Sequence, residues 1–386
     1  MNFRLLLPLF VVCTTGLAQS APRARALGVP FDGTPGPLDA ITDVKGVEVG
    51  DTTLIRGEGK LVVGQGPVRT GVTVIFPRGR ADADPVYAGW FSQNGNGEMT
   101  GTTWVEESGF LEGPLAITNT HSVGLVRDSI IAWSVKSGRL AQQPWSLPVV
   151  AETWDGYLND INGFHVQQAD VFSALDTAKD GPVPEGNVGG GTGMVCYGFK
   201  GGDGTASRVL ASDAGGYTVG VLVQCNCGRR PQLTIAGVPI GKLIPAASSK
   251  AMLEPEVRGD VGSIIIVVAT DAPLLPTQLK RLARRATMGL ARTGSSSGNS
   301  SGDIFIAFST ANRGAGKEPG PNSVLTVSNE RISPLFQATV EATEEAIVNA
   351  MVGAETMTGV DGHTVDALPH DKLTDLMKHS PQVTLK

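Results

Sequence analysis

Gly262-Ser263-Ile264-Ile265-Ile266-Val267-Val268-Ala269-Thr270 is the stretch of sequence that decides how this chain folds. The seven residues after the serine are rich in β-branched side chains, and the turn Asp271-Ala272-Pro273 follows them. A polar segment that contains proline, residues 245–262, comes before them. A short apolar run that begins after a loop and ends at a turn is typical of a buried strand. We therefore predict a core strand that begins at or beside Ser263.

The Gly262-Ser263 pair has two interpretations. The simpler one is a loop serine that happens to precede a strand. In the other, the chain cuts itself between these residues and Ser263 becomes a new amino terminus. Its hydroxyl would then be a nucleophile and its own α-amine, with a reference pKa of about 7.7–8.0, a candidate base. The local residues alone leave both interpretations open.

Composition narrows the class of protein. The chain has 386 residues with 41% hydrophobic and 18% charged side chains, which is typical of a soluble globular protein. Its 50 glycines predict many tight turns. The net charge of −6, without a basic cluster, argues against binding to nucleic acid or to an anionic membrane surface.

Residues 1–20 have the pattern of a secretory signal. Arg4 precedes an apolar run over 5–12, and the small residues Ala18 and Ser20 follow. The apolar run is too short to span a membrane. We expect a mature chain that starts near Ala21 and is exported to the periplasm or the medium.

Three cysteines remain after that cut, namely Cys196, Cys225 and Cys227. An odd set makes a disulfide framework unexpected, and one Cys-x-Cys pair is a poor zinc signal because a structural zinc site needs four ligands. We therefore expect packing thiols, two of which flank Asn226.

The rest of the chain predicts one layered α+β domain with a sandwiched core. Apolar runs predict strands at 61–63, 71–76, 115–118, 217–224, 303–309 and 323–328. Helical spacing predicts helices over 123–133, 166–179, from 276 and from 333 to 351, while 148–156 fits either strand or loop. The Gly-rich segment 185–194 lacks the Lys-Ser/Thr of a P-loop and the following helix of a dinucleotide fold. We expect it to form tight turns that bring backbone N–H groups toward a site.

Other catalytic patterns are weak. The five histidines form no HExxH motif, and no GxSxG precedes a helix. A metallopeptidase or a Ser-His-Asp hydrolase is therefore poorly supported, which favours an enzyme whose base is not histidine and returns attention to Ser263.

Four motifs together resemble one known family. They are Ser263 to Leu274, EGNVGGGTGM (185–194), VGVLVQ-x-N-x-G (219–228) and ATEEAIVNAMVGAETMTG (342–359). In this order they are similar to the β-peptidyl aminopeptidases and L-aminopeptidase/D-amidase/esterases. The likeness extends from RALGVPFDGTPG at Arg25 to LPHDKL at Leu368.

The resemblance implies a four-layer αββα sandwich, like N-terminal nucleophile hydrolases in layering but differently connected. It also implies a precursor that cuts itself into residues 21–262 and 263–386, which stay together in a single catalytic domain. Members are typically homo-oligomers, often tetramers of such processed pairs, and need no metal or other cofactor.

The same resemblance assigns roles to residues of the reaction centre. Ser263 would be the nucleophile for both self-cleavage and hydrolysis, after Gly262 whose backbone can adopt strained conformations. Asn226 would donate an N–H to the oxyanion. Ser301 and Asp303 would orient the nucleophile or its amine. Asp303 is one methylene shorter than the family's glutamate, so its contact to the amine would run through Ser301 or water.

Two further residues would bind substrate. Glu152 matches the acid that holds a free substrate ammonium, and Trp154 is expected to shape the pocket. Cys225 and Cys227 differ from the small residue and histidine expected beside Asn226.

These patterns predict an exported, self-processing serine aminopeptidase. Its substrates would be short peptides and amides with a free amine, including β-amino acid residues such as β-alanine, and L-α-residues or D-amides are alternatives. An acyltransferase of the same fold and a non-catalytic periplasmic binding protein are the rival functions.

Overall fold

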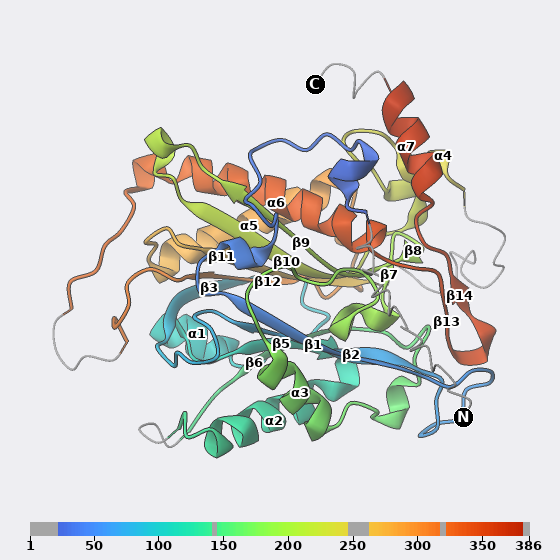
Figure 1. Cartoon of the computed structure of the whole chain (residues 1–386), viewed down its shortest axis with the longest axis horizontal. Coiled ribbons are helices and arrows are strands. Elements are labelled where there is room, and N and C mark those ends of the chain that lie inside the picture. The colour runs from blue at the N-terminus through green and yellow to red at the C-terminus, as the bar shows by residue number, and fades with distance from the viewer. Residues whose placement is uncertain (1–21, 141–144, 246–261, 317–321, 381–386) are drawn as a thin grey trace, which may run out of the picture.

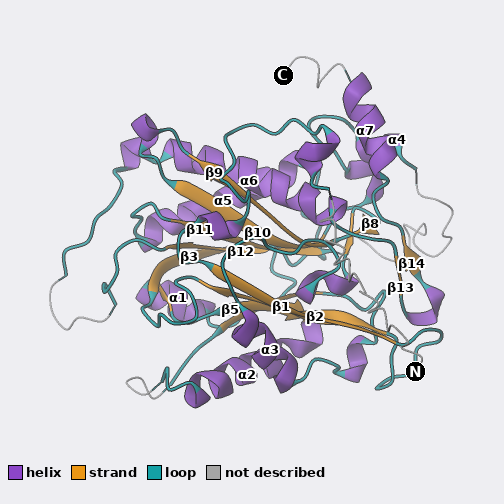
Figure 2. Ribbon diagram, in the orientation of Figure 1, coloured by secondary structure: helices purple, strands orange, loops and turns teal. Residues whose placement is uncertain are grey.

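Two β-sheets lie face to face, and helices cover both outer faces (Figures 1 and 2). The structure is a computed structural model that describes residues 22–140, 145–245, 262–316 and 322–380. One sheet has the strand order β1 (Glu48–Arg56), β2 (Val68–Phe76), β5 (Leu115–Asn119), β6 (Val149–Thr153). The other has the order β4 (Phe110–Leu111), β3 (Val86–Ser92), β12 (Ile304–Ser309), β11 (Ser263–Thr270), β10 (Thr218–Asn226), β9 (Gly202–Val209).

The long helices form the two outer layers. Helices α2 (Val123–Lys136) and α3 (Gln168–Thr177) pack on the four-stranded sheet, and α5 (Pro276–Arg292) and α6 (Ser333–Val352) pack on the six-stranded sheet. The shorter helices are α1 (Thr102–Ser108), α4 (Ile240–Leu243) and α7 (His370–His379). Two small ribbons complete the fold, β7 (Val195–Cys196) with β8 (Phe199–Lys200) and β13 (Met357–Thr358) with β14 (Thr364–Val365). No helix in the described ranges is both long and apolar enough to cross a membrane.

Strand β11 belongs to two of the three apolar cores that this layering creates. Side chains alternate across a strand, so Ile264, Ile266 and Val268 join the cluster under α5 and α6. Their neighbours Ile265, Val267 and Ala269 join the cluster between the two sheets. A third cluster lies between the four-stranded sheet and helices α2 and α3. The predicted αββα sandwich and its core strand are therefore confirmed.

Most predicted elements are present, and two predicted strands are wrong. Residues 61–63 lie in a short turn region with a single bridge at Val62, and residues 323–328 have no strand pairing. Both stretches have the composition of a strand, but their large apolar side chains, including Val63 and Leu325, are exposed because neither stretch packs on a sheet. Segment 149–153, which fitted strand or loop, is strand β6. Helix α7, which was not predicted, buries Leu373 and Met377.

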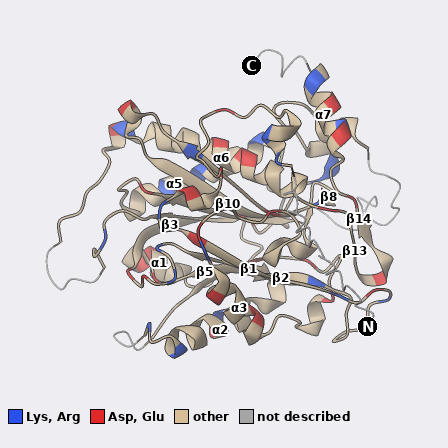
Figure 3. Ribbon diagram, viewed as in Figure 1, with Lys and Arg blue, Asp and Glu red and all other residues tan. Residues whose placement is uncertain are grey.

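Charged residues of both signs alternate over the outer helices in the view of Figure 3. An internal ion pair links the sheet to its helix layer: the guanidinium of the buried Arg208, on β9, lies 2.7 Å from Glu345 on α6. Arg25 binds the same carboxylate at 2.7 Å. Burial nevertheless raises the pKa of Glu345 to about 7. This cluster ties the N-terminal segment to the six-stranded sheet and its helix layer.

Candidate active site

Ser263 and Asn226 lie opposite each other at the ends of adjacent strands. They are the last register pair of the antiparallel strands β10 and β11. Directly opposed residues in such a pair hold their Cβ atoms about 4.5–5.5 Å apart on one face. Both side chains are buried. By alternation they share the inter-sheet face with Ile265 and Leu222. Strand β10 thus places Asn226 beside Ser263.

The loop before β12 holds the serine hydroxyl. The backbone N–H of Gly302 donates a hydrogen bond to Ser263 Oγ at 3.1 Å. Next to it, Asp303 Oδ1 accepts from the backbone N–H of Ile264 at 3.2 Å and from the hydroxyl of Ser301. Asp303 therefore reaches the backbone beside the serine directly, despite its shorter side chain. The expected Ser301-Asp303 contact is also present.

The second carboxylate oxygen of Asp303 is buried and has no hydrogen-bond partner among the described residues. Burial raises the pKa of the Asp303 carboxyl, although the hydroxyls of Ser301 and Ser297 and the N–H of Ile264 favour its charged form. A buried acceptor without a donor is costly unless a ligand or a new donor supplies one. The second oxygen of Asp303 therefore still lacks a close donor.

Crowding explains why position 262 is glycine. A Cβ atom there would lie 2.8 Å from the carbonyl oxygen of Asn226 and 3.0 Å from Cys227 Cα. The expected freedom from a Cβ clash at Gly262 is confirmed by these distances, and the strained conformation expected there stays a prediction. Glycine is required because the β10 backbone passes too close for a side chain.

The Asn226 amide is fixed at both ends. Its Oδ1 accepts from the backbone N–H of Val195 at 2.8 Å, and its Nδ2 donates to the carbonyl of Trp154 at 3.0 Å. An amide nitrogen carries two hydrogens. One of them is therefore left to donate to a reacting oxygen.

Glu152 lies on the four-stranded sheet, facing the loop that holds the serine. Its carboxylate accepts from the hydroxyl of Thr120 and, at 3.0 Å, from the backbone N–H of Glu98. A Cβ built on Gly97 would lie 3.2 Å from Glu152 Oε1 and 3.1 Å from Gly302 Cα, so only this glycine separates the two. Burial raises the pKa of Glu152. The acid thus reaches the reaction centre from the opposite sheet.

Trp154 enters the site through its backbone. The carbonyl receives the Asn226 amide, while the half-buried indole packs against the cluster of Tyr157, Leu158, Met357 and Val365. Its expected part in shaping the pocket stays a prediction.

The expectation of three packing thiols needs correction. Cys196 and Cys225 form a disulfide, and among the described residues Cys227 alone is a free thiol. Strand β10 and the ribbon β7–β8 bring the three sulfur atoms within 4.8 Å of one another, although 29 residues separate the bonded pair. Odd-number counting missed the bond because one cysteine of the three is left over.

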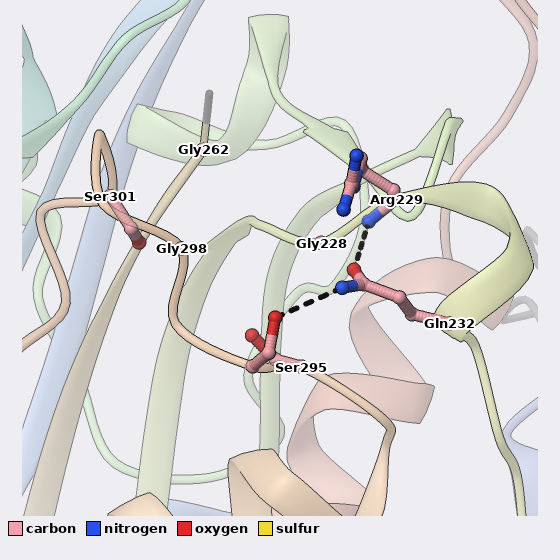
Figure 4. A pocket seen from close by; sticks show the side chains of 8 residues that line it. Gly228, Arg229, Gln232, Gly262, Ser295, Gly298 and Ser301 are labelled. Carbon is pink, nitrogen blue, oxygen red and sulfur yellow. Dashed lines mark hydrogen bonds between the residues drawn. The ribbon is translucent and has the colours of Figure 1, made fainter. Parts of the chain in front are cut away.

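A small pocket opens beside the Gly262-Ser263 junction (Figure 4). Gly262 and Ser301 line it together with Gly228, Gln232 and Ser295. Gln232 spans it, accepting from the N–H of Arg229 at 2.7 Å and donating to Ser296 at 3.0 Å. The junction therefore lies at a hollowed part of the surface.

Comparisons with known proteins agree with this geometry. A model of peptidase family S58 matches residues 39–365. The chain is 55% identical over 373 residues to the beta-peptidyl aminopeptidase BapA of Sphingosinicella microcystinivorans, covering 94% of this chain and 93% of that protein. The solved l-aminopeptidase d-ala-esterase/amidase of Ochrobactrum anthropi matches with a TM-score of 0.86 and 48% identity, over 94% of this chain and 99% of that one. The beta-aminopeptidase of a Burkholderia species matches with a TM-score of 0.83 and 48% identity, over 93% and 99%.

The fold is therefore the variant of the N-terminal nucleophile hydrolase fold that the Ochrobactrum structure represents. The chain belongs to peptidase family S58 and is a serine aminopeptidase.

Several contributors to the site were not predicted individually. They are the backbone N–H groups of Gly302 and Val195, the hydroxyl of Thr120 and the spacer Gly97. Backbone donors leave no side-chain signature. The one sequence signal is that residue 302 is glycine. The structure gives the reason, since a Cβ there would lie 2.9 Å from Gly97 Cα.

Proposed function

We propose that this aminopeptidase cuts its own chain at Gly262-Ser263 and then hydrolyses N-terminal residues through an acyl-enzyme on Ser263. The observation that carries the proposal is the meeting of three groups at one strand end. The Ser263 hydroxyl lies at the start of β11 and is held by the N–H of Gly302. Asn226 is the register partner of Ser263, and the Asp303 carboxylate accepts from the N–H of the next residue, Ile264.

In self-cleavage, Ser263 Oγ attacks the carbonyl carbon of Gly262 and the Gly262–Ser263 C–N bond breaks. The nitrogen becomes the α-amine of Ser263, and an ester joins Gly262 to the hydroxyl oxygen. Water then hydrolyses that ester, leaving a Gly262 carboxylate and a free hydroxyl. The products are residues up to 262 and residues 263–386.

The new α-amine provides the donor that Asp303 lacks. The amine nitrogen is one residue from the Ile264 N–H that already binds Asp303 Oδ1, while Oδ2 is buried without a partner. An ammonium or amine N–H on Oδ2 would satisfy it. The unprotonated amine would accept the Ser263 hydroxyl proton as the hydroxyl attacks a substrate carbonyl. Asn226 would donate to the developing oxyanion.

Glu152 would bind the substrate's free ammonium, because it places a carboxylate close to the loop that holds the nucleophile. This explains removal of N-terminal residues only, since a blocked amine loses the charge-assisted bond. Such a bond is worth about 1.5–3 kcal/mol.

Glu152→Gln tests this role. The variant keeps an acceptor for the N–H of Glu98 but loses the charge, so kcat/KM for peptides with a free amine should fall on the order of 10-fold to 10²-fold. Glu98→Gln is the matched control, because Glu98 is exposed, hydrogen-bonds Glu152 only through its backbone N–H, and has a charge that raises the pKa of Glu152, so its loss leaves the Glu152 charge in place. Equal losses in both variants, or none in Glu152→Gln, would contradict the assignment.

We propose β-amino acid residues, such as N-terminal β-alanine, as preferred substrates. The support is the named activity of the two BapA relatives, which are 55% and 50% identical to this chain. Rates on β-alanyl, L-alanyl and D-alanyl p-nitroanilides, measured side by side, decide between β-peptides, L-α-peptides and D-amides. A higher kcat/KM on either α-substrate would overturn the preference.

Export and assembly are part of the same proposal. Residues 1–20, the proposed signal, lie outside the described residues. Expression of the full chain in a bacterium, followed by N-terminal sequencing of the periplasmic fraction, should give a start near Ala21. Light scattering on the processed protein should give a mass near four times that of one cut chain, if it forms the proposed homotetramer.

A further inference from the structure

The Gly-rich segment 185–194 contains a 3-10 turn, Gly189–Gly193, that runs between the two sheets. A Cβ at Gly190 would overlap Gln224 Oε1, and one at Gly193 would overlap the carbonyl of Arg69. The tight turns expected from the sequence are confirmed. Glycine is needed here because the backbone is in contact with both sheets.

Lys200 anchors the end of this segment. Its side chain is fully buried on β8, and its Nζ donates to the carbonyls of Gly201 at 2.8 Å, Met194 at 2.9 Å and Gly191 at 3.4 Å. An ammonium has three donors and no acceptor. All three are directed at backbone oxygens around the turn.

The anchored segment ends on the Asn226 amide. Lys200 is the register partner of Val195 in the β7–β8 ribbon, and the N–H of Val195 donates to Asn226 Oδ1. Met194, which precedes Val195, accepts from Lys200, and Cys196, which follows it, is bonded to Cys225 next to Asn226. The donor to Asn226 is therefore restrained on both sides.

We propose that Lys200 is a positioning residue for catalysis, because its three hydrogen bonds hold the Val195 N–H that orients the Asn226 amide. With Oδ1 occupied by Val195, the Nδ2 hydrogens are kept for Trp154 and for the oxyanion. The inference rests on the proposed role of Asn226 as oxyanion donor.

Burial argues against a purely stabilising role for this lysine. Burial lowers the pKa of Lys200 to about 7, against the opposing effect of Asp203 and Asp155. Removing an ammonium from water is costly, and the charges of Asp203 and Asp155 offset only part of that cost; because Lys200→Met removes this compensation, its stability is measured alongside kcat. A lysine at this position is better explained by the three carbonyls that it orders.

The test is a double-mutant cycle on the full-length, self-processed enzyme. Lys200→Met, Asn226→Ala and the double variant are compared for kcat and KM on β-alanyl p-nitroanilide, with rates normalised to processed chain. Lys242→Met is the matched control, since Lys242 is exposed on α4. Lys200→Gln, which keeps two donors, is made in parallel, and thermal unfolding is recorded for every variant.

Lys200→Met should lower kcat on the order of 10-fold to 10²-fold and change KM by less than about 3-fold, because misplaced catalytic groups cost rate rather than binding. In the Asn226→Ala background the same change should lower kcat by no more than about 2-fold, since the two residues act through one interaction. Lys200→Gln should fall between the wild type and Lys200→Met.

Equal losses in both backgrounds, an unchanged Lys200→Met, or unfolding of both Lys200 variants would overturn the positioning role. The proposed function fails differently. It is wrong if Ser263→Ala retains activity or if Asn226→Ala has the wild-type rate.

Discussion

Ser263→Ala is expected to remain uncut at residue 262 and to show no measurable hydrolysis. One hydroxyl serves both reactions in the proposed mechanism, so both should disappear together. In a well-studied serine hydrolase, loss of the nucleophile costs on the order of 10⁶ in kcat. A denaturing gel should show one band from the variant and two from the wild type, and an assay on β-alanyl p-nitroanilide measures the second loss.

Ser300→Ala is the matched control. Ser300 lies in the loop before β12 that holds the Ser263 hydroxyl, and it accepts from the Asn96 amide through its backbone carbonyl, which the substitution keeps. It should process and turn over like the wild type. Ser263→Cys keeps a nucleophile and should still be cut, although more slowly. A processed, active Ser263→Ala enzyme would show that another residue performs the chemistry.

Asn226→Asp should give the second-largest effect. Aspartate has the same shape and keeps an acceptor for the Val195 N–H, but it loses the amide donor. It also places negative charge where an oxyanion would form. Loss of one oxyanion donor lowers the rate about 10²–10³-fold. Because the added charge repels the oxyanion, kcat should fall by about 10³-fold or more.

The measurement is kcat on processed enzyme, with the rate of chain cleavage as a second readout. Asn226→Ala separates the two effects, because it removes the donor without adding charge. Asn226→Asp should therefore be slower than Asn226→Ala. If both variants keep rates within a few-fold of the wild type, Asn226 does not stabilise the oxyanion.

The apolar pattern predicted a layered fold for a physical reason, whereas the αββα order and the residues of the reaction centre came from the resemblance to a family. An apolar run such as 264–270 must be buried on both faces, which requires a layer on each side, and the structure places a helix layer and a second sheet there. Strand β10 pairs with β11 and brings Asn226 opposite Ser263, a pairing that the sequence did not predict.

What the sequence did not predict depends on contacts between distant segments. The Cys196–Cys225 bond and the approach of Gly97 to Gly302 join residues that are far apart in the chain. The Lys200 anchor is local, but its acceptors are backbone carbonyls, which leave no side-chain pattern. The false strand at 323–328 shows the converse error: a run of β-forming residues does not form a strand unless it pairs with a sheet, and this run is unpaired.

The strand order of the six-stranded sheet has a further consequence for a cut chain. Strands β11 and β12, which follow residue 262, lie between β3 and β10, which precede it. The two fragments would therefore interlock, because strands of the first fragment are hydrogen-bonded to both sides of the β11–β12 pair of the second, β10 to β11 and β3 to β12. Parting them would mean dismantling the whole sheet, so the severed protein should melt in one transition and never exchange halves with its neighbours.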